Sequence, residues 1–158
     1  ISDDVAPIKI DKVPMLMPGF PYQKLCEDAM DNFKVDKEKC TSFMSDTQIK
    51  YMVPAHDEFV DYSVELFGIC ELTVGNVDEV TIEEYKGGEK MHKIIANIYR
   101  GEFLNNIGGM QPKYFKQCLD IAKNIKFYKI TRPRNQFTVN EQIELIENEI
   151  MNCEEISI

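Results

Sequence analysis

The sequence contains no tryptophan, only two histidines and no Cys-x-x-C pair. Zinc knuckles and thioredoxin-type redox sites need closely paired cysteines or cysteine and histidine together, so neither is indicated. No uninterrupted apolar run approaches the ~18 residues of a membrane-spanning helix. The catalytic motifs G-x-S-x-G and H-E-x-x-H are also missing. We therefore expect no metal, no cofactor and no membrane span.

Positive charge is scarce, and where it occurs it is concentrated. The formal net charge is −9, which disfavours binding to nucleic acid or to an anionic membrane. Residues 112–134 are basic, whereas residues 57–89 and 138–158 are acidic. Either the acidic segments pack beside the basic one, or the basic segment docks a protein partner. For docking, the candidate residues are Lys126, Lys129, Arg132 and Arg134.

The length of 158 residues suits one domain with its own core. The first residue is Ile1 and not methionine, which we interpret as removal of a signal peptide from a secreted protein. A trimmed fragment is the alternative. Instead of being secreted, the protein could be a subunit of a complex in an organelle or in the cytoplasm.

Five cysteines are present, an odd number, so one thiol would remain after two bridges. A bridge from Cys26 to Cys40 would close a short loop, and the other disulfide candidates are Cys70, Cys118 and Cys153. The competing interpretation is buried, reduced cysteines, since Cys26 and Cys118 fall on apolar faces of predicted helices.

Residues 1–21 predict an extended arm, because four prolines disfavour a helix. The arm also carries apolar side chains, which we expect to lie against the body of the fold or against a partner. The candidate partner-binding residues in it are Met15, Leu16, Met17 and Phe20.

Hydrophobic spacing predicts the elements of a single domain over residues 22–158. Steps of three and four predict helices over 22–33, 89–104 and 112–125, and a fourth that begins after Thr138 with a capping box to Glu141. Alternation predicts strands over 48–53, within 59–74, over 77–85 and over 126–131, with a hairpin across Gly75-Asn76. This order predicts an α+β fold in which a small antiparallel sheet of about four strands packs against about four amphipathic helices.

The stretch "YKGGEKMHK" (85–93) resembles a phosphate-binding loop only superficially. Its spacing matches neither the Walker pattern nor G-x-G-x-x-G, and Glu89 would compete with an anion at the helix start. We interpret it as a strand turning into a helix. His56 is followed by Asp57 and Glu58, but adjacent side chains on an extended chain point in opposite directions, so we expect no metal site there. His92 follows Met91 on the predicted helix, at the edge of its apolar face.

Three functions remain. The first is a non-enzymatic, acidic binding protein, either secreted or an accessory subunit of an assembly, with a protein as its partner. The second is a carrier of a small apolar ligand, which the many Met and Phe residues would suit. The third is a thiol-dependent enzyme with Cys70 or Cys118 as nucleophile and a histidine as base.

Overall fold

The chain is a mixed α+β protein built from small sheets and four α-helices in the described residues, as the sequence predicts. The computed structural model describes residues 3–45, 48–57 and 59–151. Contacts divide the chain into two compact units, Ile1–Leu66 (unit 1) and Phe67–Ile158 (unit 2). The predicted boundary after residue 21 falls inside unit 1 and stays a prediction. The described strands form three three-stranded sheets in place of one sheet of about four strands.

Unit 1 contains two antiparallel sheets. The first has the order β1-β2-β6, with bounds Ile8–Ile10, Pro14–Leu16 and Val64–Glu65. The second has the order β3-β5-β4, with bounds Tyr22–Cys26, Gln48–Pro54 and Thr41–Ser45. The helix α1 (Glu27–Asn32) and a short 3-10 helix, η1 (Lys37–Lys39), join β3 to β4.

Part of the N-terminal segment that was predicted to be an extended arm is a hairpin. Ile8 lies opposite Leu16 in the β1–β2 pair, and Met15 also lies opposite Glu65 on β6. The arm's prolines contribute through their carbonyls, which need no N–H: Pro7 accepts a hydrogen bond from the backbone of Met17 at 2.8 Å. Part of this segment therefore folds on itself.

The predicted helix over 22–33 is wrong in its first half. Residues 22–26 are strand β3, which pairs with β5 along its whole length, and only residues 27–32 are helical. A short apolar run fits both periodicities, and here strand pairing, a non-local interaction, decides between them. The bond from the Ala55 N–H to the Pro21 carbonyl, 2.9 Å long, continues this pairing past the strand.

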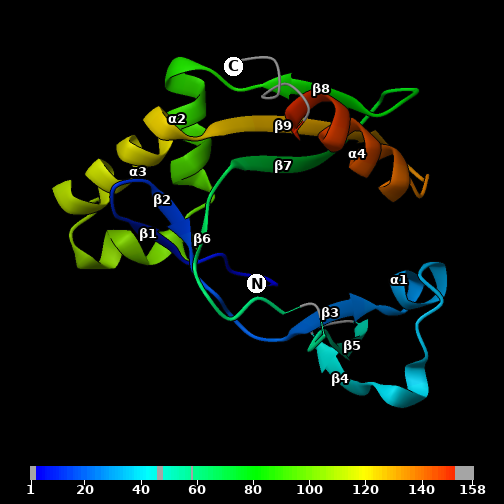
Figure 1. Ribbon diagram of the computed structural model, residues 1–158. Helices are drawn as coiled ribbons and strands as arrows, with labels where there is room; N and C mark the ends of the chain where they lie inside the picture. The colour runs from blue at the N-terminus through cyan, green and yellow to red at the C-terminus, as the bar shows by residue number, and fades with distance from the viewer. Residues whose placement is uncertain (1–2, 46–47, 58, 152–158) are drawn as a thin grey trace. The chain divides into compact units, whose positions relative to one another are not determined.

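Unit 2 is built on a mixed sheet with the order β7-β9-β8 (Figure 1). The bounds of these strands are Gly68–Gly75, Lys126–Pro133 and Thr81–Glu84. Strand β9 is parallel to β7 and antiparallel to β8. The predicted β7–β8 hairpin is therefore wrong, because β9 lies between the two strands that Gly75-Asn76 joins.

The core of unit 2 lies along the central strand β9. Phe127 and Ile130, on opposite faces of β9, are 2% and 1% exposed. The helices of this unit are α2 (Gly87–Ala96), α3 (Pro112–Asn124) and α4 (Val139–Ile146), with η2 (Gly101–Ile107) between α2 and α3 and a π-helical turn, η3 (Glu147–Met151), after α4. Figure 1 shows α2 and α3 near the end of the sheet where β7 and β9 begin, and α4 nearer the other end.

The predicted capping box at the start of α4 is not formed. Thr138 has φ −117° and ψ 31°, outside the extended conformation of a usual N-cap, and its side chain makes no cap hydrogen bond. Its hydroxyl instead accepts a hydrogen bond from Nε2 of Gln142 at 3.1 Å. Both residues are buried, so this bond satisfies the Gln142 amide inside unit 2.

Unit 1 buries far less of its apolar surface than unit 2. Among the described residues of unit 1, only Pro14 and Met30 are buried. Exposed apolar side chains are spread over it, including Phe20, Met44 and Tyr62 at 81%, 70% and 66% exposure. Single exposed apolar side chains are common on protein surfaces, so the informative ones are those that line a hollow.

Candidate binding site

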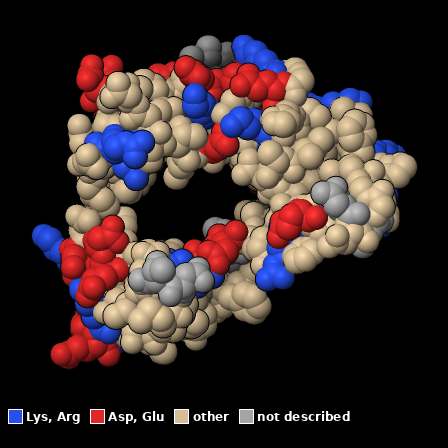
Figure 2. Space-filling view, turned by 180° about the vertical axis from the view of Figure 1, so that it is seen from behind, with Lys and Arg blue, Asp and Glu red and all other residues tan. Residues whose placement is uncertain are grey.

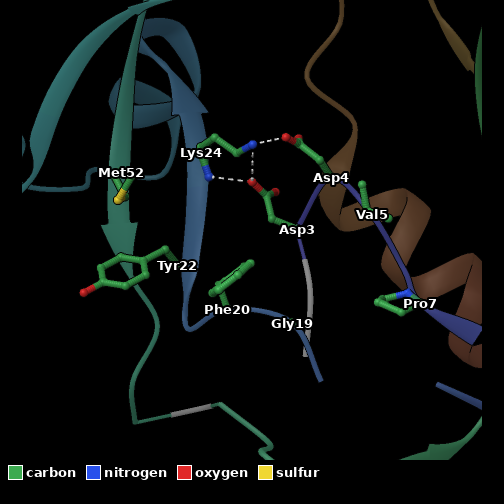
Figure 3. Close-up of a pocket in the computed structure, with 9 residues that line it drawn as sticks. All are labelled: Asp3, Asp4, Val5, Pro7, Gly19, Phe20, Tyr22, Lys24 and Met52. Carbon is green, nitrogen blue, oxygen red and sulfur yellow. Dashed lines mark hydrogen bonds and ion pairs between the residues drawn. The ribbon is translucent and has the colours of Figure 1, made fainter. Parts of the chain in front are cut away.

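A cavity of about 590 Å³ lies in unit 1 where the N-terminal arm passes strands β3 and β5 (Figure 3). We call it the arm cavity. It is lined by Asp3, Asp4, Val5, Pro7, Gly19, Phe20, Tyr22, Lys24 and Met52. The volume falls within the range of ~300–1,000 Å³ that is usual for ligand pockets.

The sheet register explains one wall of the arm cavity. Tyr22 and Lys24 are two residues apart on β3, so both side chains leave the same face of the sheet. Met52 lies directly opposite Lys24 on β5, and it shares that face. The ring of His56 meets the Tyr22 ring edge-on, with centroids 5.0 Å apart, which fixes the tyrosine from outside the cavity.

The arm supplies the charged end of the cavity. The Lys24 ammonium group forms ion pairs with Asp4 and, at 3.8 Å, with Asp3. Asp3 also accepts a hydrogen bond from the backbone N–H of Lys24 at 3.0 Å. Figure 3 shows these three side chains meeting beside Phe20. Two carboxylates and one ammonium leave this end with a net charge of −1, and Asp4 is 62% exposed.

The four predicted partner-binding residues of the arm have different environments. Met15, Leu16 and Met17 are half-buried, and the first two belong to β2. The Met17 sulfur accepts a hydrogen bond from Oγ of Ser63 at 3.2 Å. Phe20 lines the arm cavity and is 81% exposed. Of the four, Phe20 is the residue best placed to meet a partner, and the role of all four stays a prediction.

The predicted basic residues lie on or just after β9, and the strand divides them between its two faces. Lys126 and Arg132 leave one face and Lys129 leaves the other, because side chains alternate along a strand. Lys129 is 3.8 Å from Glu83 on β8, and Arg132 donates to the Gln136 carbonyl at 3.3 Å. Arg134 follows the strand and is exposed. This arrangement favours internal pairing over a single basic docking patch. On the face shown in Figure 2, acidic and basic side chains lie close to one another.

Unit 2 contains one polar cluster that the sequence did not reveal, formed by Glu71 on β7, Tyr85 after β8 and Lys93 on α2. The Tyr85 hydroxyl and the Lys93 ammonium both donate to Glu71, with Lys93 Nζ 2.9 Å from Oε2. These donors hold the pKa of Glu71 below its usual range, the Tyr85 bond contributing most. Burial, and then Glu71, raises the pKa of Tyr85, while Glu71 raises that of Lys93.

The hydrogen bonds of this cluster connect three elements of unit 2. Each group is in its ordinary charge state and is bonded to another member, so the trio ties α2 to the sheet. Lys129 lies opposite Glu71 in the ladder and Glu83 lies opposite Lys129, which extends the charge alternation across all three strands. The members are far apart in the sequence, so no local pattern could have predicted the cluster.

The thiols of the described chain do not form an active-site pair. Cys26, Cys40, Cys70 and Cys118 are free, so the predicted Cys26–Cys40 bridge is not formed, and Cys153 lies outside the described residues. Burial raises the pKa of the Cys70 and Cys118 thiols, which disfavours the reactive thiolate. Within the described ranges, neither thiol is hydrogen-bonded to a histidine.

The glycine stretch "YKGGEKMHK" is a strand-to-helix turn, as predicted. Strand β8 ends at Glu84 and α2 begins at Gly87, whose φ of +52° suits glycine. Tyr85 is 5% exposed and Lys86 lies 3.7 Å from Glu84. No metal-binding group of three or more His, Cys, Asp or Glu residues occurs in the part of the chain that the structure describes, and no helix there is long and apolar enough to cross a membrane.

Comparison with known proteins adds no relative. Neither the protein-family models, nor the curated proteins, nor the solved structures contain a match to this chain. The function can therefore be inferred only from the geometry and chemistry of the sites themselves.

Proposed function

We propose that this protein is a non-enzymatic binding protein, and that its arm cavity receives an apolar side chain of a protein partner. One observation carries the proposal: Phe20, 81% exposed, lies beside a cavity of about 590 Å³ in a unit whose apolar surface is poorly buried. Aromatic residues beside such hollows are the usual anchors of protein interfaces.

The charges at the cavity define the partner further. The exposed Asp4 carboxylate and the net charge of −1 at this end favour a partner segment in which Lys or Arg flanks the apolar side chain. The whole chain, at −9, would attract such a segment over longer distances. We propose that this chain itself is either a secreted protein or an accessory subunit of a larger assembly.

The experiment is a selection of displayed random peptides on the immobilised protein. Enriched peptides should carry an apolar residue next to Lys or Arg. Phe20→Asp should abolish their binding, because a charge would replace the apolar contact, whereas the matched control Tyr62→Asp should leave it intact. Tyr62 is in the same unit and is 66% exposed, but it does not line the cavity. Equal binding by both variants would refute the proposed site.

The volume of the cavity supports a second candidate function, a carrier of a small apolar ligand. Its walls include Val5, Pro7 and Met52, and its ion-paired end could accept a polar head group. A fluorescent apolar probe such as an anilinonaphthalene should then bind one site per chain. Met52→Asp should remove this site, whereas Met44→Asp, a change at another exposed methionine of unit 1, should preserve it. Probe binding without peptide enrichment would favour the carrier over the protein-binding function.

A thiol-dependent enzyme is the least supported of the three functions. The raised pKa values of the Cys70 and Cys118 thiols oppose nucleophilic chemistry, and neither thiol is hydrogen-bonded to a histidine in the described residues. If complete alkylation abolished peptide or probe binding, loss of packing would explain it. Only the loss of a measured enzymatic turnover on alkylation would support the enzyme function.

A further inference from the structure

Strand β7 is an edge strand of the sheet in unit 2, and its composition suits pairing with a further strand. It is hydrogen-bonded to β9 on one side, and in the described chain no second strand pairs with its other side. Natural edge strands are usually short or carry Lys or Pro to prevent pairing. β7 is eight residues long, "GICELTVG", with neither Lys, Arg nor Pro. Leu72 and Val74 on it are 64% and 43% exposed.

We propose that a second copy of this chain pairs with β7 through the same strand, in the antiparallel direction and centred on Leu72. Pairing of two identical edges in this way has two-fold symmetry, and it would join the two three-stranded sheets into one of six strands. The backbone N–H and C=O groups of the free edge would bond to those of the second copy.

The residue pattern of β7 is complementary to itself in this register. On one face, Leu72 would lie opposite Leu72 of the second copy, and Cys70 opposite Val74, so that apolar side chains meet apolar side chains. On the other face, Glu71 would lie opposite Thr73, an uncharged side chain whose hydroxyl is already bonded to the Ile130 carbonyl of its own chain, so no like charge opposes the carboxylate. The glycines at both ends of the strand add no obstructing side chain.

Neighbouring registers are less favourable. Centring the pair on Glu71 would put two carboxylates directly opposite each other, which is destabilising. Centring it on Thr73 would put Cys70 opposite Asn76, beyond the end of the strand. The Glu71 carboxylate itself does not oppose the Leu72-centred register, because it is already bonded to Tyr85 and Lys93 within its own chain.

The oligomeric state tests the proposal. Sedimentation velocity over a concentration series should show a monomer–dimer equilibrium for the unchanged chain. Leu72→Lys should shift this equilibrium to monomer, because two ammonium groups would face each other at the centre of the pair. The control Ile143→Lys, on α4 in the same unit at 48% exposure, should leave the equilibrium unchanged. Each copy carries a net charge of −9, so the two copies repel each other. Added salt screens this repulsion and should therefore strengthen the dimer.

A designed cross-link tests the register separately. In the Leu72-centred pair, Val74→Cys would place a new thiol opposite Cys70 of the second copy. Within one chain these positions are four residues apart, about 13 Å along a strand, which is beyond disulfide reach. Mild oxidation should therefore give a covalent dimer on a non-reducing gel. This dimer should disappear when Cys70→Ala is combined with Val74→Cys, and Thr73→Cys, on the opposite face, should not form it.

Three results would overturn the proposal. One is a chain that stays monomeric at every concentration. Another is a dimer that persists in Leu72→Lys, since it would form through another surface. The third is a cross-link from Thr73→Cys as efficient as that from Val74→Cys. Circular dichroism of each variant establishes that it is folded, and exposed positions such as Leu72 should tolerate the change.

Discussion

Replacing Phe20 with alanine should separate binding from stability. Phe20 is 81% exposed, so about one fifth of its surface is buried in the folded chain. A phenylalanine that is fully buried removes roughly 200 Å² from water, so this fifth corresponds to about 40 Å². At about 25 cal/mol per Å², Phe20→Ala should lower the free energy of unfolding by about 1 kcal/mol or less.

The comparison is the same substitution in the core of unit 2. Phe127 is 2% exposed and its ring meets the Tyr85 ring edge-on at a centroid distance of 5.3 Å. Phe127→Ala should therefore cost about 3–5 kcal/mol. Urea-induced unfolding followed by circular dichroism measures both values. Peptides selected on the unchanged protein should bind Phe20→Ala at least about tenfold more weakly, as expected for an interface anchor.

Two outcomes would refute this reasoning. If Phe20→Ala cost as much as Phe127→Ala, Phe20 would belong to the core of the arm, and the proposed function would lose its exposed anchor. If Phe20→Ala were stable and bound the selected peptides with unchanged affinity, the arm cavity would not be the binding site.

Three further predictions concern stability, pH and thiols. Gly75→Ala should lower the free energy of unfolding by about 1–3 kcal/mol, because the added Cβ would lie 2.6 Å from the Cγ2 methyl of Thr131. The control Gly88→Ala has open space around the added Cβ and should not lower it. Equal urea midpoints for the two variants would contradict this prediction. Glu71→Gln should cost about 1 kcal/mol at pH 7, since two donors lose a charged acceptor. In the folded protein the pKa of the Glu71 carboxyl is lowered, so the stabilisation that Glu71 provides is present above its unfolded pKa of about 4.3 and is lost as the pH falls through the folded value. If the unfolding free energies of Glu71→Gln and the unchanged protein still differed at acidic pH, this reasoning would be wrong. Alkylation of the unfolded, unreduced protein should label all four cysteines that the structure describes as free, and protection of any pair among them would show oxidation and strengthen the proposal of secretion.

Local pattern was sufficient where an element depends on its own residues. The helical spacing over 112–125 gave α3 nearly to the residue, because Pro112 fixes its first turn and one apolar face, including Cys118 and Ile121, repeats at helical steps. The strand over 48–53 was likewise predicted, and it is β5. The order of the predicted helices and strands also predicted the α+β class.

Tertiary structure decided what depends on distant partners. Strand β9 enters between β7 and β8 because both of its faces are apolar enough for a central position, whereas Glu83 and Glu84 suit β8 to an edge. A parallel β7–β9 pair needs a long connection, which residues 76–125 provide, and no local signal indicates which strand will return. For the same reason, residues 22–26 became a strand only because β5 lies beside them.

The two candidate sites divide in the same way. The sequence determined that residues 1–21 are apolar and rich in proline, because composition is a local property, and it made Phe20 a candidate for partner binding. Only the structure showed that Tyr22, Lys24 and Met52 form one wall against that arm, since strand register brings together residues nearly thirty positions apart. The free edge of β7 exists because β9 bonds to one side of it and no described strand bonds to the other. Pairing of backbone groups is set by the whole fold, and side-chain pattern alone cannot specify it.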